Sequence, residues 1–381
     1  MNSKKQKTKR VLYVSEKAGF FGGVERYIYD TAKALKNAGW AVSMMFAEEA
    51  RDLKSFLALF DNNFRTGEID QIIAEEDFDL VVIFKVTDAG LVSKLRMSFN
   101  TSVCVSDHDY YCARHHKYFP LGRINCILPS NLFYCSICTM GCGKMFKFSA
   151  LLNEIRKCRS FIVLSEFMRG NLLMNGFDEK AVYKIYPVRE LPEKQNRKKA
   201  FSKPPVIMFA GQLIRGKGVD LMLRALARLD RKYHALIVGD GKDMEFLKNL
   251  ASGLGIADKV EFTGWQNDVA KFWDKADIAV FPSRWQEPFG LTGIEAFAHK
   301  VPVIAFDVGG VTEWLYHGKN GLVVPSKDVT TLYAELEYLL GSPETAEAMG
   351  VVGYKFVSKN FRPEKFVSAM SAMLKETRSD K

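Results

Sequence analysis

The sequence predicts an α/β protein made of two doubly wound domains, each with a parallel sheet. Short apolar runs alternate with helical segments along most of the 381 residues, which is typical of strands alternating with helices. Residues 191–205 (LPEKQNRKKAFSKPP) break this alternation, and their polar, basic and proline-bearing composition is typical of a linker. A chain of this length can bury two separate cores. We therefore expect one domain over residues 1–195 and a second over residues 204–360.

Composition and charge exclude several classes of protein. The 48% hydrophobic and 26% charged residues are ordinary for a globular chain, and no apolar run approaches the length of a membrane span. The basic start, MNSKKQKTKR, is followed by an apolar run (VLYV) that meets Ser15, Glu16 and Lys17 at once, which is too short for a signal peptide. We therefore expect a cytoplasmic protein.

The net charge of +10 is compatible with nucleic acid, an anionic membrane or phosphorylated substrates as partners. Basic residues cluster at the amino terminus and in residues 114–117, 144–159 and 189–203, not along one periodic helix, and no nucleic-acid motif accompanies them. This distribution favours an anionic membrane surface near the first domain, at the inner face of the membrane, and no nucleic acid. Solvated basic faces without a partner are the alternative.

The first domain begins with a strand, a glycine-containing loop and a helix. Gly22 and Gly23 precede the helix expected over residues 24–38, and glycines there let a backbone approach a phosphate closely, although plain turns use them too. Apolar runs place the strands of this domain at residues 11–14, 41–46, 80–84, 102–106, 161–164 and 185–188.

His108 follows the fourth of these strands, in the sequence Asp107-His108-Asp109-Tyr110. Open parallel sheets bind ligands at the carboxyl ends of their strands, so His108 is the best candidate for a functional imidazole. A histidine satisfied within the core is the alternative.

An insert at about residues 110–145 contains five cysteines. Cys135 and Cys138 have the tight spacing of a metal knuckle, and Cys112 and Cys126 can complete a four-sulfur structural zinc site. Cys142 is the fifth, and disulfides are not expected in a reducing cytoplasm. A second Cys-x2-Cys pair is missing, so an iron–sulfur or redox centre and free thiols remain alternatives.

The second domain repeats the alternation. Arg215 and Lys217 follow its first strand, and a guanidinium and an ammonium both suit a diphosphate, although a solvated loop is the alternative. Apolar runs place its strands at residues 206–210, 235–238, 260–263, 276–281 and 302–306, with helices over 330–340 and 361–375.

Glu287 and Glu295 stand eight positions apart in the stretch FPSRWQEPFGLTGIEAFAHK. The segment from Pro288 to Gly293 is expected to be a turn into a helix, so Glu287 precedes the helix and Glu295 lies inside it. A helix N-terminus binds anions, which makes the amides after Glu287 a candidate phosphate site. Carboxylates accept hydrogen bonds and suit the hydroxyls of a sugar and a ribose. A capping role for Glu287 is the alternative.

This stretch resembles the Glu-x7-Glu signature of the retaining glycosyltransferases of family four, which have the two-domain GT-B fold. The likeness includes the preceding Pro-Ser, the Pro-Phe-Gly after Glu287, the Pro-Val-Ile and the Gly309-Gly310 pair. It extends over nearly the whole chain and is weakest across the cysteine insert. The resemblance implies that the last segment, residues 361–381, returns to the first domain.

The resemblance implies transfer of a sugar from a nucleotide-sugar to a glycan or lipid-linked acceptor, with retention of configuration and without a catalytic metal. Glu287, Lys217, Arg215 and His108 are then catalytic: Glu287 and His108 orient the sugar, and the two cations stabilise the leaving diphosphate. Gln212 stands where the family commonly has an arginine, and Arg215 can compensate. The expected substrate-binding residues are Gly22, Gly23, Gln212, Gly239, Gly241, Trp265, Gln266, Phe289, Gly290, Leu291, Thr292 and Glu295.

Two other functions remain open at this stage. A sugar-nucleotide epimerase of the same fold would turn over a nucleotide-sugar without an acceptor, and its additional acid and base groups are not visible in the sequence. A zinc-bearing nucleic-acid-binding protein is the other, and it depends on the charge and the cysteines. Steep salt dependence of DNA binding would distinguish it.

Overall fold

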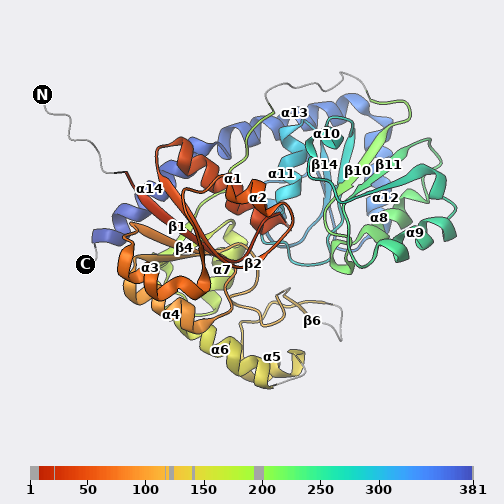
Figure 1. Cartoon of the computed structure of the whole chain (residues 1–381). Coiled ribbons are helices and arrows are strands. Elements are labelled where there is room, and N and C mark those ends of the chain that lie inside the picture. Colours follow the sequence, from red (N-terminus) through yellow and green to blue (C-terminus); the bar gives the residue numbers. More distant parts are fainter. Residues whose placement is uncertain are drawn as a thin grey trace, which may run out of the picture. The chain divides into compact units, whose positions relative to one another are not determined.

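The structure is a computed structural model that describes residues 8–20, 22–115, 117–119, 124–139, 142–192 and 201–379 (Figure 1). The chain divides into two compact units. The first comprises Met1–Val188 with Phe361–Lys381, and the second comprises Arg189–Asn360. Residues 193–200 of the expected linker lie outside the described residues. Two α/β units with parallel sheets confirm the predicted fold class.

The first unit contains a seven-stranded parallel sheet with the order β3-β2-β1-β4-β5-β8-β9. Its central strands are apolar on both faces because helices cover both, as is usual for parallel sheets. The strands are β1 Arg10–Ala18, β2 Ala41–Glu49, β3 Asn63–Arg65, β4 Leu80–Ile83, β5 Thr101–Val105, β8 Ser160–Val163 and β9 Val182–Lys184.

One predicted strand of this sheet was wrong. Residues 185–188 were expected to form the last strand, whereas β9 is Val182–Lys184, which pairs with β8. Pro187 has no backbone N–H to donate to a neighbouring strand, so the apolar run around it is a poor strand. The side chains of Ile185 and Val188 are buried, and the N–H of Ile185 still donates to the carbonyl oxygen of Val163 in β8 at 2.9 Å, but the strand does not continue to Val188.

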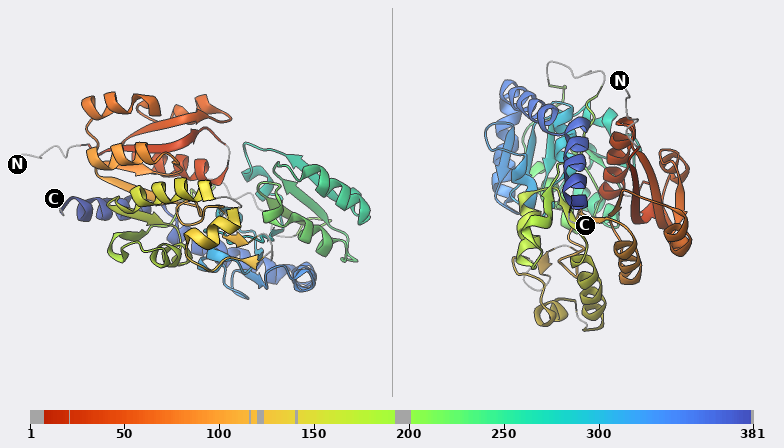
Figure 2. Two further views of the ribbon diagram at one scale, coloured as in Figure 1. Left: turned by 90° about the horizontal axis from the view of Figure 1, so that it is seen from below. Right: turned by 90° about the vertical axis from the view of Figure 1, so that its left-hand side faces the viewer.

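Helices cover both faces of the first sheet. Helices α1 and α14 lie side by side on one face, and α3, α4 and α6 follow one another on the other (Figures 1 and 2). The C-terminal helix α14 therefore belongs to the first unit. The helices are α1 Gly23–Asn37, α2 Leu53–Leu57, α3 Ile69–Glu75, α4 Ala89–Ser98, α5 Leu132–Thr139, α6 Cys142–Arg156, α7 Glu166–Met174 and α14 Pro363–Ser379, with 3-10 turns at Thr66–Glu68 and Glu179–Ala181.

The second unit contains a six-stranded parallel sheet with the order β12-β11-β10-β13-β14-β15. The predicted strands of this unit are confirmed to within two residues. They are β10 Val206–Ala210, β11 His234–Val238, β12 Val260–Gly264, β13 Ile278–Phe281 and β14 Val303–Phe306. The sixth strand, β15 Gly321–Val324, was not predicted.

In the second unit, helix α8 packs between α9 and α12, and α11 packs against α13. None of the described helices of the chain combines the length and apolar character that a bilayer span requires. The helices of this unit are α8 Val219–Leu226, α9 Met244–Gly253, α10 Ala270–Trp273, α11 Leu291–Ala298, α12 Val329–Gly341 and α13 Pro343–Asn360, with 3-10 turns at Arg215–Lys217, Ala257–Lys259 and Gly309–Glu313.

In both sheets, successive strands are added first on one side of the unit's first strand and then on its other side, so the strand order reverses there. In the first unit the reversal lies between β1 and β4, and in the second it lies between β10 and β13. The chain leaves the two strands in opposite directions there, so a crevice opens beyond their carboxyl ends. These two switch points are therefore where ligand sites are expected.

Candidate functional site

At the switch point of the second unit, the loops that follow β10 and β13 touch. Gly218 has a φ of 70°, and a Cβ atom added there would lie 1.8 Å from the carbonyl oxygen of Pro282. The backbone N–H of Arg284 also donates to the carbonyl oxygen of Gly216 at 2.7 Å. Only glycine allows this approach, and the approach brings the basic loop at residues 215–217 beside Glu287.

Lys217 and Glu287 form an ion pair at this point. The Lys217 Nζ lies 2.7 Å from Oε1 of Glu287, and the Ser283 hydroxyl donates to the same oxygen. Glu287 is only 6% exposed. A buried carboxylate needs such partners, because an unpaired charge in the interior costs several kcal/mol. Two predicted catalytic groups, far apart in sequence, are thus in direct contact.

Arg215 belongs to a second set of charges beside this pair. Asp220, in the first turn of α8, accepts two hydrogen bonds from Arg284 at 2.5 and 2.6 Å and pairs with Arg215 at 3.0 Å. The guanidinium of Arg284 also donates to the carbonyl oxygen of Arg215 at 2.9 Å. Arg284 is buried, whereas Arg215 is half-exposed. Arg284 therefore fixes the loop, and Arg215 is the cation that solvent or a ligand reaches.

Helix α11 begins at this site without a side-chain cap. Its N-cap residue, Gly290, has a φ of 90° and no capping hydrogen bond, so the alternative that Glu287 caps the helix does not hold. The indole of Trp314 donates to the carbonyl oxygen of Phe289 at 2.6 Å and holds the start of the helix in place. The helix begins at Leu291, earlier than the end of the turn expected at Gly293. The amides at its N-terminus carry the partial positive charge of the helix dipole beside Glu287.

Glu295 lies inside α11, as predicted, and Nη1 of Arg189 is 3.0 Å from its Oε1. Both side chains are mostly buried. Arg189 stands at the start of the second unit, and nothing in its local sequence distinguished it from the other basic residues of the linker.

The loops after β10, β11 and β12 are held together by close backbone contacts. A Cβ atom at Gly239 would lie 1.9 Å from the carbonyl oxygen of Gly211, and one at Gly241 would lie 2.4 Å from that of Leu213. These two glycines therefore have a packing role in the described structure. In the neighbouring loop, Trp265 donates to Asn267 at 2.8 Å and Gln266 donates to the carbonyl oxygen of Thr263 at 3.0 Å. The nucleobase contacts expected of these residues and of Gln212 stay a prediction.

In the first unit, His108 follows β5 as predicted and is buried. Its Nδ1 lies 2.7 Å from the hydroxyl of Tyr111, and its ring meets those of Tyr111 and Phe167 edge to face. The expected contact of His108 with a sugar stays a prediction. Gly22 is the N-cap of α1 and provides no side-chain cap, and Gly23 is the first residue of that helix.

The carboxylates on either side of His108 face a single lysine. Lys85, after β4, lies 2.6 Å from Asp107 and 3.4 Å from Asp109. Burial, reinforced by the charge of Asp109, raises the pKa of Asp107 to about 7. Burial also acts on Asp109, but hydrogen bonds from His115 and Asp107 and the charge of Lys85 lower its pKa well below the usual range. The loop that carries His108 thus contains a partly exposed network of charges at the carboxyl end of β5.

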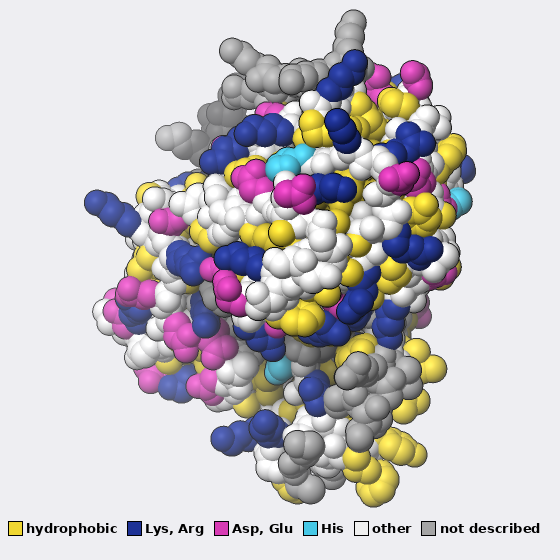
Figure 3. All heavy atoms as spheres, turned by 90° about the vertical axis from the view of Figure 1, so that its right-hand side faces the viewer, with side chains coloured by type: hydrophobic (Ala, Val, Ile, Leu, Met, Phe, Trp, Pro, Cys, Tyr) yellow, Lys and Arg dark blue, Asp and Glu magenta, His cyan; other side chains and the backbone are white. Residues whose placement is uncertain are grey.

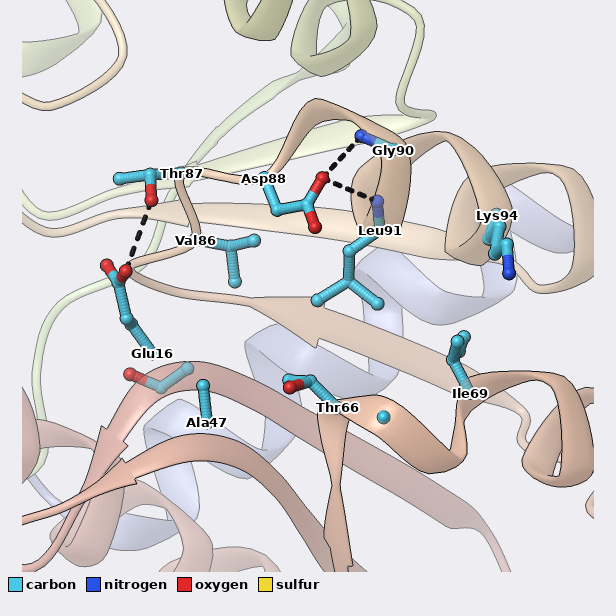
Figure 4. Close-up of a pocket in the computed structure, with 12 residues that line it drawn as sticks. Glu16, Ala47, Thr66, Ile69, Val86, Thr87, Asp88, Gly90, Leu91 and Lys94 are labelled. Carbon is cyan, nitrogen blue, oxygen red and sulfur yellow. Dashed lines mark hydrogen bonds between the residues drawn. The ribbon is translucent and has the colours of Figure 1, made fainter.

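A pocket of about 430 Å³ opens at the switch point of the first unit, between the ends of β1 and β4 (Figure 4). Glu16 accepts a hydrogen bond from Thr87 at 3.2 Å, and Asp88 caps α4 through the amides of Gly90 and Leu91. The buried hydroxyl of Ser15 also lines the pocket and has no hydrogen-bond partner among the described residues. The pocket thus offers carboxylates, hydroxyls and an apolar floor. The sequence analysis did not identify it, because its residues come from separate loops without a motif.

The four cysteines of the predicted metal site line one hollow of about 430 Å³ in the insert, together with mainly apolar residues. Burial, with the charge of neighbouring thiols, raises the pKa of Cys135 and Cys138. No group of three or more His, Cys, Asp or Glu side chains within the described part of the chain is arranged to hold a metal ion. His116 and the side chain of Cys142 lie outside the described residues. The zinc site therefore stays a prediction.

Comparison of the whole chain with solved structures identifies the class of fold. The structure of the Anabaena protein HepE in complex with UDP-glucose matches with a TM-score of 0.76 and 16% identity, over 96% of this chain and 99% of that one. The chain therefore has the GT-B fold. Identity at this level shows the fold alone.

Sequence comparison finds a similarity to a family model within the second part of the chain. Residues 192–356 match the model of the glycosyl transferases group 1. An exopolysaccharide phosphotransferase of Streptomyces coelicolor is 35% identical over 148 residues, which are 38% of this chain and 16% of that protein. A GDP-mannose-dependent alpha-(1-6)-phosphatidylinositol monomannoside mannosyltransferase of Mycolicibacterium smegmatis is 34% identical over 169 residues, 42% of this chain and 44% of that one. The match thus spans less than half the length of either relative.

Three residues of the site were missed by the sequence analysis. Asp220 and Arg284 form the bidentate pair that fixes the basic loop, and Ser283 donates to Glu287. Arg284 follows the strand predicted at 276–281, and its partner Asp220 lies 64 positions away in the sequence, so no local pattern indicated the pair. The Pro-Ser before Arg284 was the only local indication.

Proposed function

We propose that this chain is a glycosyltransferase that moves a sugar from a nucleotide-diphosphate sugar to an acceptor with retention of configuration. The observation that carries the proposal is the contact of Lys217 with Glu287 beside the uncapped N-terminus of α11. A cation, an acceptor-only carboxylate and a row of helix amides together match a diphosphate joined to a polyol. The match of residues 192–356 to the glycosyl transferases group 1 supports this assignment.

The proposed mechanism is front-face transfer without a protein nucleophile. When the donor binds, its diphosphate takes the place of Glu287 at the Lys217 ammonium and extends toward Arg215 and the amides of Leu291 and Thr292. Glu287 then accepts hydrogen bonds from the sugar hydroxyls, and Glu295 accepts them from the ribose. These fixed charges stabilise the negative charge that develops on the departing diphosphate, which is usually the largest catalytic contribution.

The pocket at the switch point of the first unit is the proposed acceptor site. Glu16 and Asp88 present carboxylate oxygens, and the partnerless hydroxyl of Ser15 offers a further contact. Sugar hydroxyls are the groups that such a lining recognises. The acceptor is therefore proposed to be a glycan or a lipid-linked sugar, consistent with the mannosyltransferase relative, which is named for phosphatidylinositol monomannoside.

The experiment that tests the proposal begins with a thermal-shift screen of UDP, GDP and ADP, followed by the sugars of the nucleotide that binds. A ligand at about 100 times its dissociation constant should stabilise the protein by about 2.7 kcal/mol. The selected donor is then incubated with glycan and lipid-linked acceptors, and the anomeric configuration of the first product is determined by NMR. An inverted product would refute retention. Conversion of the donor without an acceptor would favour the epimerase, and tight, salt-sensitive DNA binding would favour the nucleic-acid-binding protein.

We also propose that the insert of the first unit contacts an anionic membrane surface. Large hydrophobic side chains are exposed in the loop before α5, on α5 and on α6, and hydrophobic side chains gather at the lower end of the molecule in Figure 3. Exposed Lys144 and Lys147 lie on α6 beside them. Apolar groups with adjacent cations are typical of a surface that enters the headgroup region of anionic lipids. The exposed apolar residues are Ile127, Leu128, Phe133, Tyr134, Ile137 and Phe146.

Sedimentation with vesicles tests this contact. The wild-type chain should sediment with vesicles that contain phosphatidylglycerol and much less with neutral phosphatidylcholine vesicles. Replacing Phe133, Tyr134 and Ile137 by serine should abolish sedimentation, whereas serine at the exposed residues Met97 and Met174, outside the insert, should not. If the triple variant of the insert and the double variant outside it sediment equally, this surface is not the contact.

A further inference from the structure

We propose that the group of the acceptor that enters the pocket of the first unit carries a protonated amine, as an amino sugar does. The assignment rests on the proposed function, because it names the substrate class of the proposed acceptor site. The pocket, of about 430 Å³, lies at the switch point between β1 and β4. Its described lining contains three charged residues, Glu16, Asp88 and Lys94. The partners of these three residues decide which acceptor the pocket suits.

The ammonium of Lys94 already has a carboxylate partner. Its Nζ lies 2.6 and 2.9 Å from the two carboxylate oxygens of Asp70, which does not line the pocket. The nearby Lys85, in the loop after β4, pairs in the same way with Asp107 and Asp109 at 2.6 and 3.4 Å. An anionic acceptor would therefore have to break one of these ion pairs to reach a cation.

Glu16 and Asp88, in contrast, form no ion pair with any residue that the structure describes. One oxygen of Glu16 accepts a hydrogen bond from the hydroxyl of Thr87 at 3.2 Å. One oxygen of Asp88 accepts from the amides of Gly90 and Leu91 at 2.7 and 3.2 Å, and the other is turned away from these amides (Figure 4). Each carboxylate therefore offers its second oxygen to a ligand.

Ser15 is the residue that indicates a ligand beside these carboxylates. It lines the pocket, its side chain is only 1% exposed, and its hydroxyl has no hydrogen-bond partner in the described ranges of the chain. Buried polar atoms are rarely left without a partner in folded proteins. A bound group that donates a hydrogen bond to this hydroxyl oxygen would satisfy it. Solvated surface carboxylates alone do not explain such a hydroxyl.

An alkylammonium group matches this lining better than a neutral hydroxyl or an anion does. It has three N–H donors and no acceptor, and the lining offers the second oxygens of Glu16 and Asp88 together with the hydroxyl oxygen of Ser15. Hydrogen bonds between two charged groups are roughly twice as strong as neutral ones. A phosphate or carboxylate in the pocket would meet two like charges without a free cation, which discriminates against it.

The start of α4 supports the choice of a cation. A helix N-terminus is the usual backbone site for a phosphate. In α4 that position is already occupied, because the Asp88 carboxylate accepts from the first amides of the helix. In the second unit the N-terminus of α11 has no such cap, and Lys217 lies nearby beside Glu287. The chain thus has an anion site at one switch point and, as proposed, a cation site at the other.

The test measures binding of sugars to the full wild-type chain without a donor, by ligand-observed NMR. The probes are the methyl glycosides of glucosamine, mannosamine and 6-amino-6-deoxyglucose, each beside its N-acetylated form, and glucose 6-phosphate. We expect an amine to bind about 10-fold more tightly than its N-acetylated form, and this preference to shrink as salt is added. Equal binding of every amine and its N-acetylated form, or tightest binding of the phosphate, would overturn the proposal.

Two conservative variants assign the preference to this pocket. Glu16→Gln and Asp88→Asn each remove a charge but keep an oxygen for the hydroxyl of Thr87 and for the helix amides, so both should fold. Each should lower the preference for the amine by about 10-fold. Glu75→Gln, which removes an exposed carboxylate on α3 outside the lining, is the matched control and should retain the preference. A preference that survives in both pocket variants contradicts the assignment.

Ser15→Ala separates a role in binding from a role in folding. The hydroxyl has no partner in the described structure, so its loss should leave the unfolding midpoint unchanged and weaken binding of the amine. A lower midpoint with unchanged binding would show a structural role and count against the proposal. Sugar transfer to neutral acceptors without any preference for amines would overturn this inference alone. Absence of transfer from every nucleotide-sugar, with the preference intact, would overturn the proposed function instead.

Discussion

Lys217 and Lys117 meet very different surroundings. Lys217, in the second unit, pairs with Glu287 at 2.7 Å, beside Asp220, which pairs with both Arg215 and Arg284. Lys117, in the insert of the first unit, is more deeply buried and meets a carbonyl oxygen. The first site pairs each of its cations with a carboxylate and can exchange one partner for a ligand. The second holds its ammonium through a carbonyl oxygen, without a carboxylate among the described residues.

The largest expected effect follows from breaking the neutral pair in the second unit. Lys217→Met leaves Glu287 buried without its cation, so we expect a loss of about 3 to 5 kcal/mol in the free energy of unfolding. Glu287→Gln in the same chain should restore most of that stability without restoring sugar transfer. Denaturant unfolding of the single and double variants measures the stability that is lost and the stability that is restored. A loss below about 1 kcal/mol for Lys217→Met would show that the pair is not a buried one.

The next prediction separates the two glutamates of the site. Glu287→Ala should lower kcat, because its contact is to the sugar whose bond breaks; a lost charge-assisted hydrogen bond corresponds to about 10-fold to 150-fold in kcat/KM. Glu295→Ala should weaken binding of the free nucleotide diphosphate instead, because that ligand carries ribose but no sugar. Calorimetric titration of the free diphosphate compares the two variants. Equal weakening in both, with transfer intact, would contradict the assignment.

The lysine of the insert should behave in the opposite way. Lys117→Met removes a buried charge that has no carboxylate partner among the described residues, so the protein should not lose stability. Denaturant unfolding measures this, with the exposed Lys144→Met as the matched control. A loss of more than about 1 kcal/mol in Lys117→Met alone would show that a partner compensates this ammonium.

The smallest expected effect is no effect. Nucleotide diphosphate should bind with the same affinity in EDTA, because cations and helix amides meet the anion in the second unit and no metal carboxylate pair is required. Titration in buffer with and without EDTA checks this. An affinity that collapses on chelation and returns with manganese would show that the site depends on a metal.

Much of the fold could be predicted because its elements are short and strongly apolar. The strand Val206–Ala210 was predicted residue for residue, and the helix after Gly290 was placed correctly around Glu295. The strand around Pro187 was wrong because burial, not pairing, explains its apolar side chains. Sequence periodicity reports which residues are buried, but not which of them join a ladder.

The site was predicted less completely because pairing between distant residues leaves no local pattern. Glu287 and Lys217 were each identified, yet their contact spans 70 positions. The pairing of Arg189 with Glu295 and that of Arg284 with Asp220 were not visible for the same reason. The burial of Lys117 could not be predicted either, since lysine in a basic run is normally solvated.

The start of α11 also limits what sequence variation can reveal about this protein. Gly290 has a left-handed backbone conformation with the Phe281 ring close by, and a Cβ atom at Gly293 would lie 2.0 Å from the Trp314 ring. Any side chain there would disrupt folding whether or not a ligand ever binds. A mutational scan selected only for soluble protein would therefore find these glycines intolerant, so their invariance among homologues would not by itself report activity. The informative positions are Glu287 and Glu295, where the effect of a substitution on folding can be measured separately from its effect on turnover.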